Sequence, residues 1–290
     1  MIQKAIVLTA GLGTRFLPLS KVLPKEFWPL AAKPMIQYIV EEAVNSGINH
    51  IIFVVRPGQS MVFDYFKKPV KELEQILKER NNEASLERLL QFEDTFRGVS
   101  FSFVIEKEPL GDGHAILKAK KLIGNEPFAV LFDDDIVESK TPCSRQLISV
   151  FKTCQKPVLS LHRISKERFS FYGIVGVEKI ASRLFKMKKI VEKPPQEEAP
   201  SDLAVVGKYI LTPEIFSYLQ KLTPNSRGEI ILADALSKMI NDGKLVYGYE
   251  LEGEWWECGN PQAYLETNFH FSLKHPEYGP KLKEFLKNYK

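Results

Sequence analysis

Several groups of residues in this 290-residue sequence have the types and spacing to bind and polarise phosphate. The first is the run of residues 10–15, Ala-Gly-Leu-Gly-Thr-Arg, which follows a short apolar stretch. Its glycines let backbone N–H groups approach phosphate oxygens, and the guanidinium of Arg15 can bridge two of them. Lys25 supplies a second cation once the chain folds back. We therefore interpret residues 10–15, the glycine loop, as a phosphate cradle built by Ala10, Gly11, Gly13, Thr14 and Arg15.

Two better-known glycine motifs do not fit this loop. The dinucleotide fingerprint needs a third glycine at the position of Phe16, and the Walker A motif needs a Gly-Lys-Ser/Thr run that is absent. A Gly-X-Gly run after a strand is a weak signal when it stands alone. The interpretation therefore depends on the residues that accompany it.

A cluster of carboxylates, Asp133, Asp134 and Asp135, directly follows the apolar residues 129–132. Mg²⁺ in proteins takes one or two carboxylates together with substrate phosphates, so this cluster is a candidate metal site. An acidic turn that is only solvated and caps the next helix fits the local sequence equally well. The residues by themselves leave both interpretations open.

The elements that must position these groups alternate between short apolar runs and amphipathic stretches, which predicts βαβ units and a parallel sheet. Strands are predicted at residues 5–9, 51–55, 101–105, 128–132, 158–162, 173–177, 185–191 and 204–211. Helices are predicted at residues 34–46, 113–122, 213–219, 229–240 and 261–273, and residues 71–94 form a highly charged helical excursion. The glycine loop then lies at the carboxyl end of the first strand, where open α/β sheets bind ligands.

The fold class predicted from this order is α/β, with a Rossmann-like mixed, mostly parallel sheet flanked by helices. No linker is long enough to separate independent units. We therefore expect a single domain over residues 1–290, with a nucleotide-binding half at 1–142 and a sugar-phosphate-binding half at 143–290.

Composition excludes several classes of partner. The net charge of +4 is spread along the chain, which favours a small phosphate-rich substrate over nucleic acid. Three cysteines without a Cys-X-X-Cys pair argue against a disulfide framework or a zinc site and fit a reducing compartment. The first apolar run of about six residues is too short for a signal segment, and no run approaches the roughly 20 residues of a membrane span. We expect a cytoplasmic protein that contacts no membrane.

The sequence resembles the sugar-nucleotide pyrophosphorylases, and among them the bacterial uridylyltransferases that use UTP and glucose 1-phosphate. The resemblance begins with residues 10–15, continues through Pro24-Lys25-Glu26, and extends in order over nearly the whole chain. Its other segments are residues 33–38, 108–111, 113–115, 172–175, 191–194, 207–211, 228–230 and 258–260.

The resemblance implies a nucleotidyltransferase of the GT-A-like kind with a smaller, β-rich sugar-binding part. It implies that UTP and glucose 1-phosphate form UDP-glucose and pyrophosphate with the help of Mg²⁺, in a homo-oligomer of two or four subunits. The residues it assigns to catalysis are Arg15, Lys25 and Lys193, and those it assigns to the metal are Asp134 and Glu257. It assigns Gly173, Glu192 and Lys193 to the sugar phosphate, and the glycine loop, Glu26, Glu106, Gly111 and Asp112 to the nucleotide.

Three of the departures from the family pattern bear on the base and on the metal. Glu106 stands where the uridylyl members carry glutamine, Asp112 replaces a leucine, and Glu257 replaces an aspartate. An ionised carboxylate only accepts hydrogen bonds, so Glu106 would repel uracil O4 but would pair with the N1–H and N2–H₂ groups of guanine.

We favour UTP, and two alternatives stay open: a guanylyl or other nucleotidyltransferase of the same fold, or a non-catalytic nucleotide-sensing module. His114 is expected to contact backbone or phosphate near a helix start, rather than to act as an acid or base. The retention of Arg15, Lys25, Asp134 and Lys193 argues against decay to a sensor.

Overall fold

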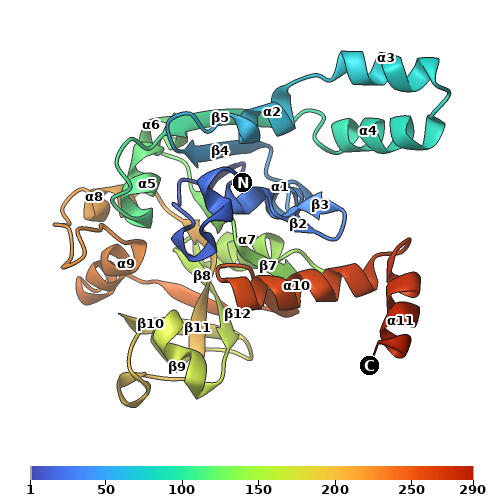
Figure 1. Ribbon diagram of the computed structural model, residues 1–290. Helices are drawn as coiled ribbons and strands as arrows, with labels where there is room; N and C mark the ends of the chain where they lie inside the picture. The colour runs from blue at the N-terminus through green and yellow to red at the C-terminus, as the bar shows by residue number, and fades with distance from the viewer. Residues whose placement is uncertain (1, 290) are drawn as a thin grey trace.

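The computed structural model describes residues 2–289, and its centre is a nine-stranded mixed sheet (Figure 1). In spatial order its strands are β5 (Ser100–Ile105), β4 (His50–Val55), β1 (Lys4–Leu8), β6 (Phe128–Phe132), β11 (Leu203–Leu211), β8 (Val158–Arg163), β12 (Tyr247–Glu250), β10 (Leu184–Glu192) and β9 (Gly173–Lys179). Neighbours from β5 to β6 pair in parallel, and only β10 and β11 run against the other strands. The predicted mixed, mostly parallel sheet is therefore confirmed.

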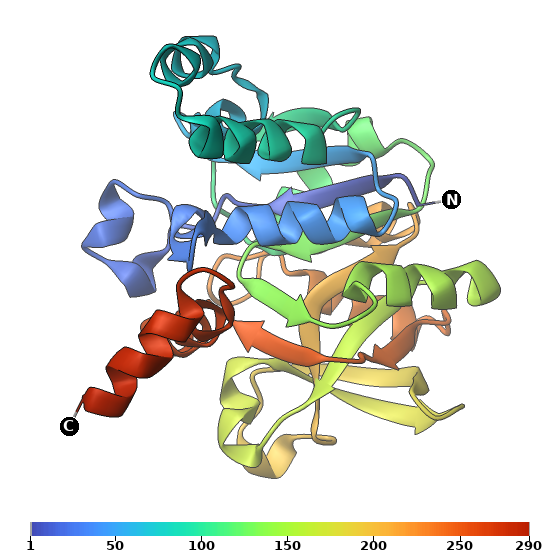
Figure 2. The ribbon, with the colours of Figure 1, turned by 90° about the vertical axis from the view of Figure 1, so that its right-hand side faces the viewer.

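Helices cover both faces of this sheet. Helices α1 (Met35–Asn45) and α7 (Cys143–Cys154) pack on one face and lie in front of the sheet in Figure 2. Helices α5 (Asp112–Lys118), α8 (Ile215–Leu219) and α9 (Leu232–Asn241) pack on the other. Strand β1 serves both layers, because successive side chains of a strand point to opposite faces: Ala5 and Val7 meet α1, and Ile6 meets α5.

Sequence signals explain where α1 begins and ends. Pro34 precedes its first residue in an extended conformation, and Gly47 follows its last turn with a φ of 89°. Proline suits a helix start because it lacks an N–H that would be left without a partner there, and glycine adopts a positive φ with little strain. The helix predicted at residues 34–46 is confirmed.

Two predicted helices differ from the structure. The helix expected at residues 113–122 is divided at Ala119 into α5 and the short α6 (Lys120–Ile123). The helix expected from Glu229 begins only at Leu232, because the backbone of Ile230 is held in another pairing. Its N–H donates to the carbonyl of Leu110 at 2.7 Å, and its carbonyl accepts from the N–H of Gly113 at 3.0 Å.

Two small sheets were not predicted. In one, β7 (Asp135–Glu138) pairs with β13 (Glu254–Glu257) antiparallel, in a register that sets Glu257 opposite Asp135. In the other, β2 (Pro29–Leu30) pairs with β3 (Lys33–Pro34) beyond the glycine loop. The first of these sheets places β13, from the later part of the chain, beside the acidic cluster.

Helices at the periphery extend away from the sheet. The charged excursion forms a hairpin of α3 (Lys71–Glu79) and α4 (Glu83–Thr95), preceded by α2 (Met61–Lys67). Helices α10 (Pro261–Lys274) and α11 (Gly279–Asn288) form a C-terminal arm, of which only α10 was predicted. Within residues 2–289, every helix is too short or too polar to cross a membrane.

Candidate active site

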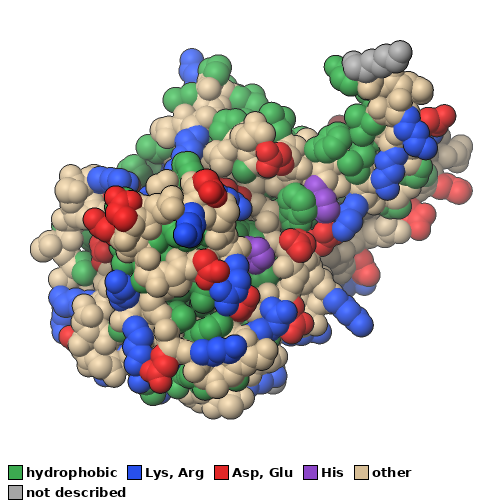
Figure 3. Space-filling model, turned by 90° about the horizontal axis from the view of Figure 1, so that it is seen from below, with side chains coloured by type: hydrophobic (Ala, Val, Ile, Leu, Met, Phe, Trp, Pro, Cys, Tyr) green, Lys and Arg blue, Asp and Glu red, His purple; other side chains and the backbone are tan. Residues whose placement is uncertain are grey.

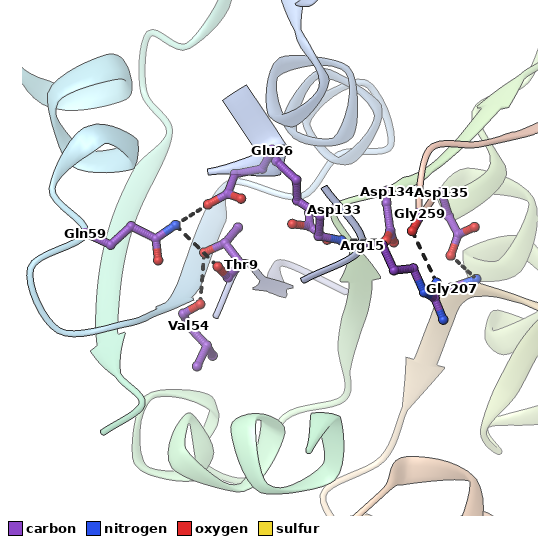
Figure 4. A network of polar contacts seen from close by, with 11 residues as sticks. Thr9, Arg15, Glu26, Val54, Gln59, Asp133, Asp134, Asp135, Gly207 and Gly259 are labelled. Atoms are coloured by element: carbon purple, nitrogen blue, oxygen red, sulfur yellow. Dashed lines mark hydrogen bonds and ion pairs between the residues drawn. The ribbon is translucent and has the colours of Figure 1, made fainter. Parts of the chain in front are cut away.

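The glycine loop turns sharply at the carboxyl end of β1. Gly13 has a φ of 62°, and the hydroxyl of Ser20 donates to its carbonyl at 2.8 Å. Thr14 then begins a single 3₁₀ turn that directs Arg15 across the sheet edge. The Nη1 of Arg15 donates to the carbonyl of Gly259 at 3.2 Å, so the loop reaches the end of β13 (Figure 4).

Lys25 lies on the acidic cluster. Its Nζ donates to Oδ1 of Asp133 at 2.8 Å and to Oδ2 of Asp134 at 2.5 Å. Burial opposes the charge on Lys25, but the two carboxylates outweigh burial and raise its pKa. Burial also raises the pKa of Asp133 to about 6, against the attraction of Lys25. The lysine is thus a fixed cation that neutralises part of the carboxylate charge.

Asp134 and Glu257 face one another across Gly259. A Cβ added to Gly259 would lie 3.0 Å from Oδ2 of Asp134 and 3.1 Å from Oε1 of Glu257. Both oxygens therefore border the space beside Gly259, the gap, which a side chain at that position would enter. Facing carboxylate oxygens are the ligands that Mg²⁺ prefers, and one or two of them normally suffice because phosphates complete the shell. These residues fit the metal that the sequence predicts.

Glu26 is buried behind the glycine loop, with 1% of its surface exposed. Its Oε1 accepts from Nε2 of Gln59, which also donates to the carbonyl of Thr9 at 3.3 Å (Figure 4). Burial, with a contribution from Asp133, raises the pKa of Glu26 to about 8. Glu26 thus packs under the loop through Gln59, a partner that the sequence did not indicate.

Gly111 and Asp112 line a cavity of about 560 Å³, which we call the main cavity because most of the predicted site residues lie on it; a second cavity, beside α3 and α4, has a larger volume of about 960 Å³. Gly111 has a φ of 101°, and a Cβ there would lie 2.6 Å from the carbonyl of Ile230, so only glycine fits. Asp112 is partly buried, and its Oδ1 accepts from the N–H of Leu232 at 2.8 Å. Burial raises the pKa of Asp112 to about 6.

Glu106 lies outside the main cavity. With 2% of its surface exposed, it lines a smaller cavity of about 400 Å³ together with Leu12, Arg56 and Gln59. Its Oε1 is 2.8 Å from Nδ1 of His114. Burial raises the pKa of Glu106, and His114 opposes this shift. The two departures at the expected base site therefore face different spaces. The side chain of His114 contacts the carboxylate of Glu106, while its backbone N–H donates to the carbonyl of Ile230 at 3.3 Å.

The residues expected at the sugar phosphate gather on the opposite wall of the main cavity, at the paired ends of β9 and β10. Gly173 is opposite Glu192, and a Cβ on Gly173 would lie 3.1 Å from Oε2 of Glu192. Lys193 follows with a φ of 49°, and its Nζ is 3.2 Å from Oε1 of Glu192. This left-handed turn directs Lys193 to the cavity.

The main cavity thus brings together most of the predicted site residues. Its lining includes Arg15, Gly111, Asp112, Asp134, Gly173, Glu192, Lys193 and Glu257. Sequence reasoning missed the indole of Trp255, which donates from Nε1 to Oδ1 of Asp135 at 2.6 Å, and the side chains of Asn225 and Arg227. The paired tryptophans before Glu257 are the signal in the sequence that could have indicated Trp255.

Comparison with known proteins gives a consistent result. The family model described as nucleotidyl transferase matches residues 4–272. A protein of Staphylococcus haemolyticus named UTP–glucose-1-phosphate uridylyltransferase is 42% identical over 286 residues, which cover 99% of this chain and 98% of that protein. A protein of the same name from Staphylococcus epidermidis is 41% identical with the same coverage.

Solved structures agree in fold and in length. A UTP-bound UGPase from Acinetobacter baumannii is 36% identical and superposes with a TM-score of 0.91 over 100% of both chains. A UDP-glucose pyrophosphorylase complexed with UDP-glucose is also 36% identical, with a TM-score of 0.85 over 95% of this chain and 100% of its own. The resemblance predicted from the sequence is confirmed. The chain belongs to the nucleotidyl transferase family, among the UTP–glucose-1-phosphate uridylyltransferases that it matches over its full length.

Proposed function

We propose that this protein is an enzyme that forms UDP-glucose and pyrophosphate from UTP and glucose 1-phosphate. The observation that carries the proposal is a single cavity with Arg15 at one wall, Lys193 at the other, and the carboxylates of Asp134 and Glu257 beside the path between them. Two phosphate-bearing substrates need cations at both ends of the cavity that binds them. They also need a place between these cations, shielded from water, where they can react. The relatives named for this activity support the choice of substrates.

The reaction is an in-line attack by an oxygen of the sugar phosphate on the α-phosphorus of the triphosphate. The bond between the α-phosphorus and the bridging oxygen breaks, and pyrophosphate leaves. A sugar phosphate has a second pKa near ~6, so at neutral pH its oxygen needs no general base. What the reaction requires is alignment of the two substrates and neutralisation of their negative charge, and the protein provides both.

Each residue then has a defined task. The glycine loop binds the triphosphate through backbone N–H groups, and Arg15 and Lys25 stabilise negative charge on the leaving pyrophosphate. Lys193 and Glu192 hold the phosphate and the hydroxyls of the sugar, with Gly173 permitting close approach. Asp134 and Glu257 would hold Mg²⁺, which would supply positive charge to stabilise the negative charge of the reacting phosphates. Residues 1–142 thus serve the nucleotide and 143–290 the sugar phosphate, with Glu257 joining the two.

Pyrophosphate release measured with each of the four triphosphates, against glucose 1-phosphate and mannose 1-phosphate, tests the substrates. UTP with glucose 1-phosphate is expected to give the highest kcat/KM. A preference for GTP with mannose 1-phosphate would support the guanylyl alternative. Triphosphate binding without release in any combination would support a sensing module and contradict the enzyme.

We propose in addition that the protein forms a homo-oligomer and works in a reducing compartment such as the cytoplasm. The C-terminal arm supports the first point, since Leu265, Phe269 and Phe285 are 60%, 47% and 59% exposed, and hydrophobic side chains lie along it in Figure 3. The free thiols of Cys143, Cys154 and Cys258 support the second. Light scattering after size exclusion is expected to give at least a dimer, and Phe285→Glu is expected to shift it towards monomer. A monomeric wild type would contradict the oligomer.

A further inference from the structure

The side chain of Glu257 is held on one side only. Its Oε1 faces the gap beside Gly259, as described above. Its Oε2 instead accepts from the hydroxyl of Tyr172 and lies 3.6 Å from Nη2 of Arg168. The two oxygens of one carboxylate therefore have separate surroundings, one within the protein and one open to the gap.

Tyr172 is itself fixed by its neighbours. The Nη2 of Arg168 donates to its hydroxyl at 2.7 Å, and the guanidinium lies over its ring at 5.2 Å from the centroid. The ring of Trp255 packs edge-on against it, with centroids 4.8 Å apart. Because Trp255 also donates to Asp135, the tyrosine ring is locked against the strand pair that carries Glu257.

Glutamate has one more rotatable bond than aspartate, and fixing a long side chain costs conformational entropy. A free Glu257 would hold its carboxylate in the gap only part of the time. The hydrogen bond from Tyr172 removes this freedom, and it leaves Oε1 at the gap beside Gly259 that Oδ2 of Asp134 also borders. Hydrogen bonds to metal ligands orient them in this way, and their loss lowers metal affinity by about 10–100-fold.

We propose that Tyr172, supported by Arg168, is a positioning residue that presents Glu257 to a divalent cation through one oxygen. The inference rests on the proposed function, because it assumes that Asp134 and Glu257 hold the cation. It assigns a task to the hydroxyl of Tyr172 that is separate from its backbone, whose carbonyl accepts from the N–H of Lys193 at 3.0 Å.

Because the hydroxyl and the carbonyl of Tyr172 have separate tasks, one substitution can remove the first and keep the second. Mn²⁺ is titrated into the protein without substrates, and the free ion is measured by its electron paramagnetic resonance signal. Tyr172→Phe removes the hydroxyl and keeps both the ring and the carbonyl. We expect its dissociation constant for Mn²⁺ to rise about tenfold, with the KM for glucose 1-phosphate within about twofold of wild type because the carbonyl still holds Lys193.

Further variants separate the proposal from a general structural effect. Arg168→Met, at a half-exposed position, is also expected to weaken Mn²⁺ binding, but by a smaller factor than Tyr172→Phe. Tyr278→Phe, an exposed tyrosine of the C-terminal arm, is expected to leave it unchanged. In a Glu257→Asp background we expect the shorter side chain not to reach the hydroxyl of Tyr172. Adding Tyr172→Phe to that variant is therefore expected to raise the dissociation constant for Mn²⁺ by less than about twofold.

The outcomes are distinguishable. Wild-type affinity in Tyr172→Phe, or an equal loss in the Glu257→Asp background, would overturn the positioning role and leave the proposed function intact. Failure of the wild type to bind Mn²⁺ would contradict the metal site, and with it both the proposed role of Glu257 and this inference.

Discussion

Lys193 is the side chain whose proposed task is easiest to isolate, because it directly follows β10 and, within residues 2–289, has only Glu192 as an ionic partner. Lys193→Ala is expected to lower kcat/KM for glucose 1-phosphate by about 10- to 150-fold, because a lost charged hydrogen bond costs about 1.5–3 kcal/mol. The KM for UTP should change by less than about twofold. Lys188→Ala, which removes an exposed partner of Glu178, is the matched control. Steady-state rates close to wild type in Lys193→Ala would refute the assignment.

Gly259 is the residue that keeps the carboxylate gap open. Its φ is not in the left-handed region, so Gly259→Ala strains the backbone little, but the new Cβ would lie 3.0 and 3.1 Å from the two carboxylate oxygens. We expect a tenfold or greater rise in the Mg²⁺ concentration needed for half-maximal rate, with a melting temperature within a few degrees of wild type. An unchanged Mg²⁺ dependence would show that the cation binds elsewhere.

Residue types and spacing, together with the resemblance, indicated many of the residues that line the main cavity but not their neighbours. The glycine loop indicated Arg15 directly, whereas Asp134 and Lys193 were assigned through the resemblance, because the local residues left the acidic cluster open between a metal site and a solvated turn. The pairing of Glu106 with His114, and of Glu26 with Gln59, depends on how distant backbone segments pack. No local pattern encodes such pairs, and the sequence could not predict which way these carboxylates turn.

At the scale of elements, the least predictable feature is the β7 and β13 pair. Each strand has four residues, and β13 reads Glu-Trp-Trp-Glu without the alternation of a half-buried strand. The long, regular elements were predicted because their apolar period extends over many residues. The short pair forms because Trp255 reaches Asp135 and Trp256 stacks on His270, which are contacts that only the folded chain provides.

Asp112 joins two elements, since it begins α5 and accepts a hydrogen bond from the first residue of α9. Its folded pKa of about 6 lies above the ordinary value of 3.8, so the folded protein binds this proton more tightly and loses stability as pH rises from about 4 to about 6. Asp112→Asn keeps the acceptor without the charge.

We expect Asp112→Asn to be more stable than wild type by about 1–2 kcal/mol at pH 8 and equal to it near pH 4. Scanning calorimetry at both pH values measures this as a melting temperature about 2–6 °C higher at pH 8 only. A variant that is less stable than wild type at pH 8 would mean that the charge of Asp112 supports the two helices.

At the scale of the whole molecule, β11 joins the two halves by pairing with β6 and β8. Lys208 on this strand is fully buried, with its Nζ 3.3 Å from Oε2 of Glu42 on α1. Glu42 in turn accepts from the N–H of Ser144 on α7 at 2.9 Å. One buried ion pair thus connects the sheet to both helices of that face.

Lys208→Met is expected to lower the free energy of unfolding by about 3–5 kcal/mol, because Glu42 stays buried without its cation. Lys244→Met removes an exposed pair with Glu214 and is expected to cost less than about 1 kcal/mol. Denaturant unfolding measures both. Adding Glu42→Gln should recover part of the loss, and a Lys208→Met protein as stable as the control would contradict the role of the pair.

Transfer of a uridylyl group to glucose 1-phosphate is the activity on which the proposed tasks of all these residues depend. It is tested most directly by following label from UTP carrying ³²P at either the α or the γ position, with Mg²⁺ and glucose 1-phosphate. We predict that the α label appears in UDP-glucose and the γ label in pyrophosphate, in equal amounts, and that Asp134→Ala abolishes both. Retention of both labels in UTP, or release of the γ label as free phosphate, would contradict the account.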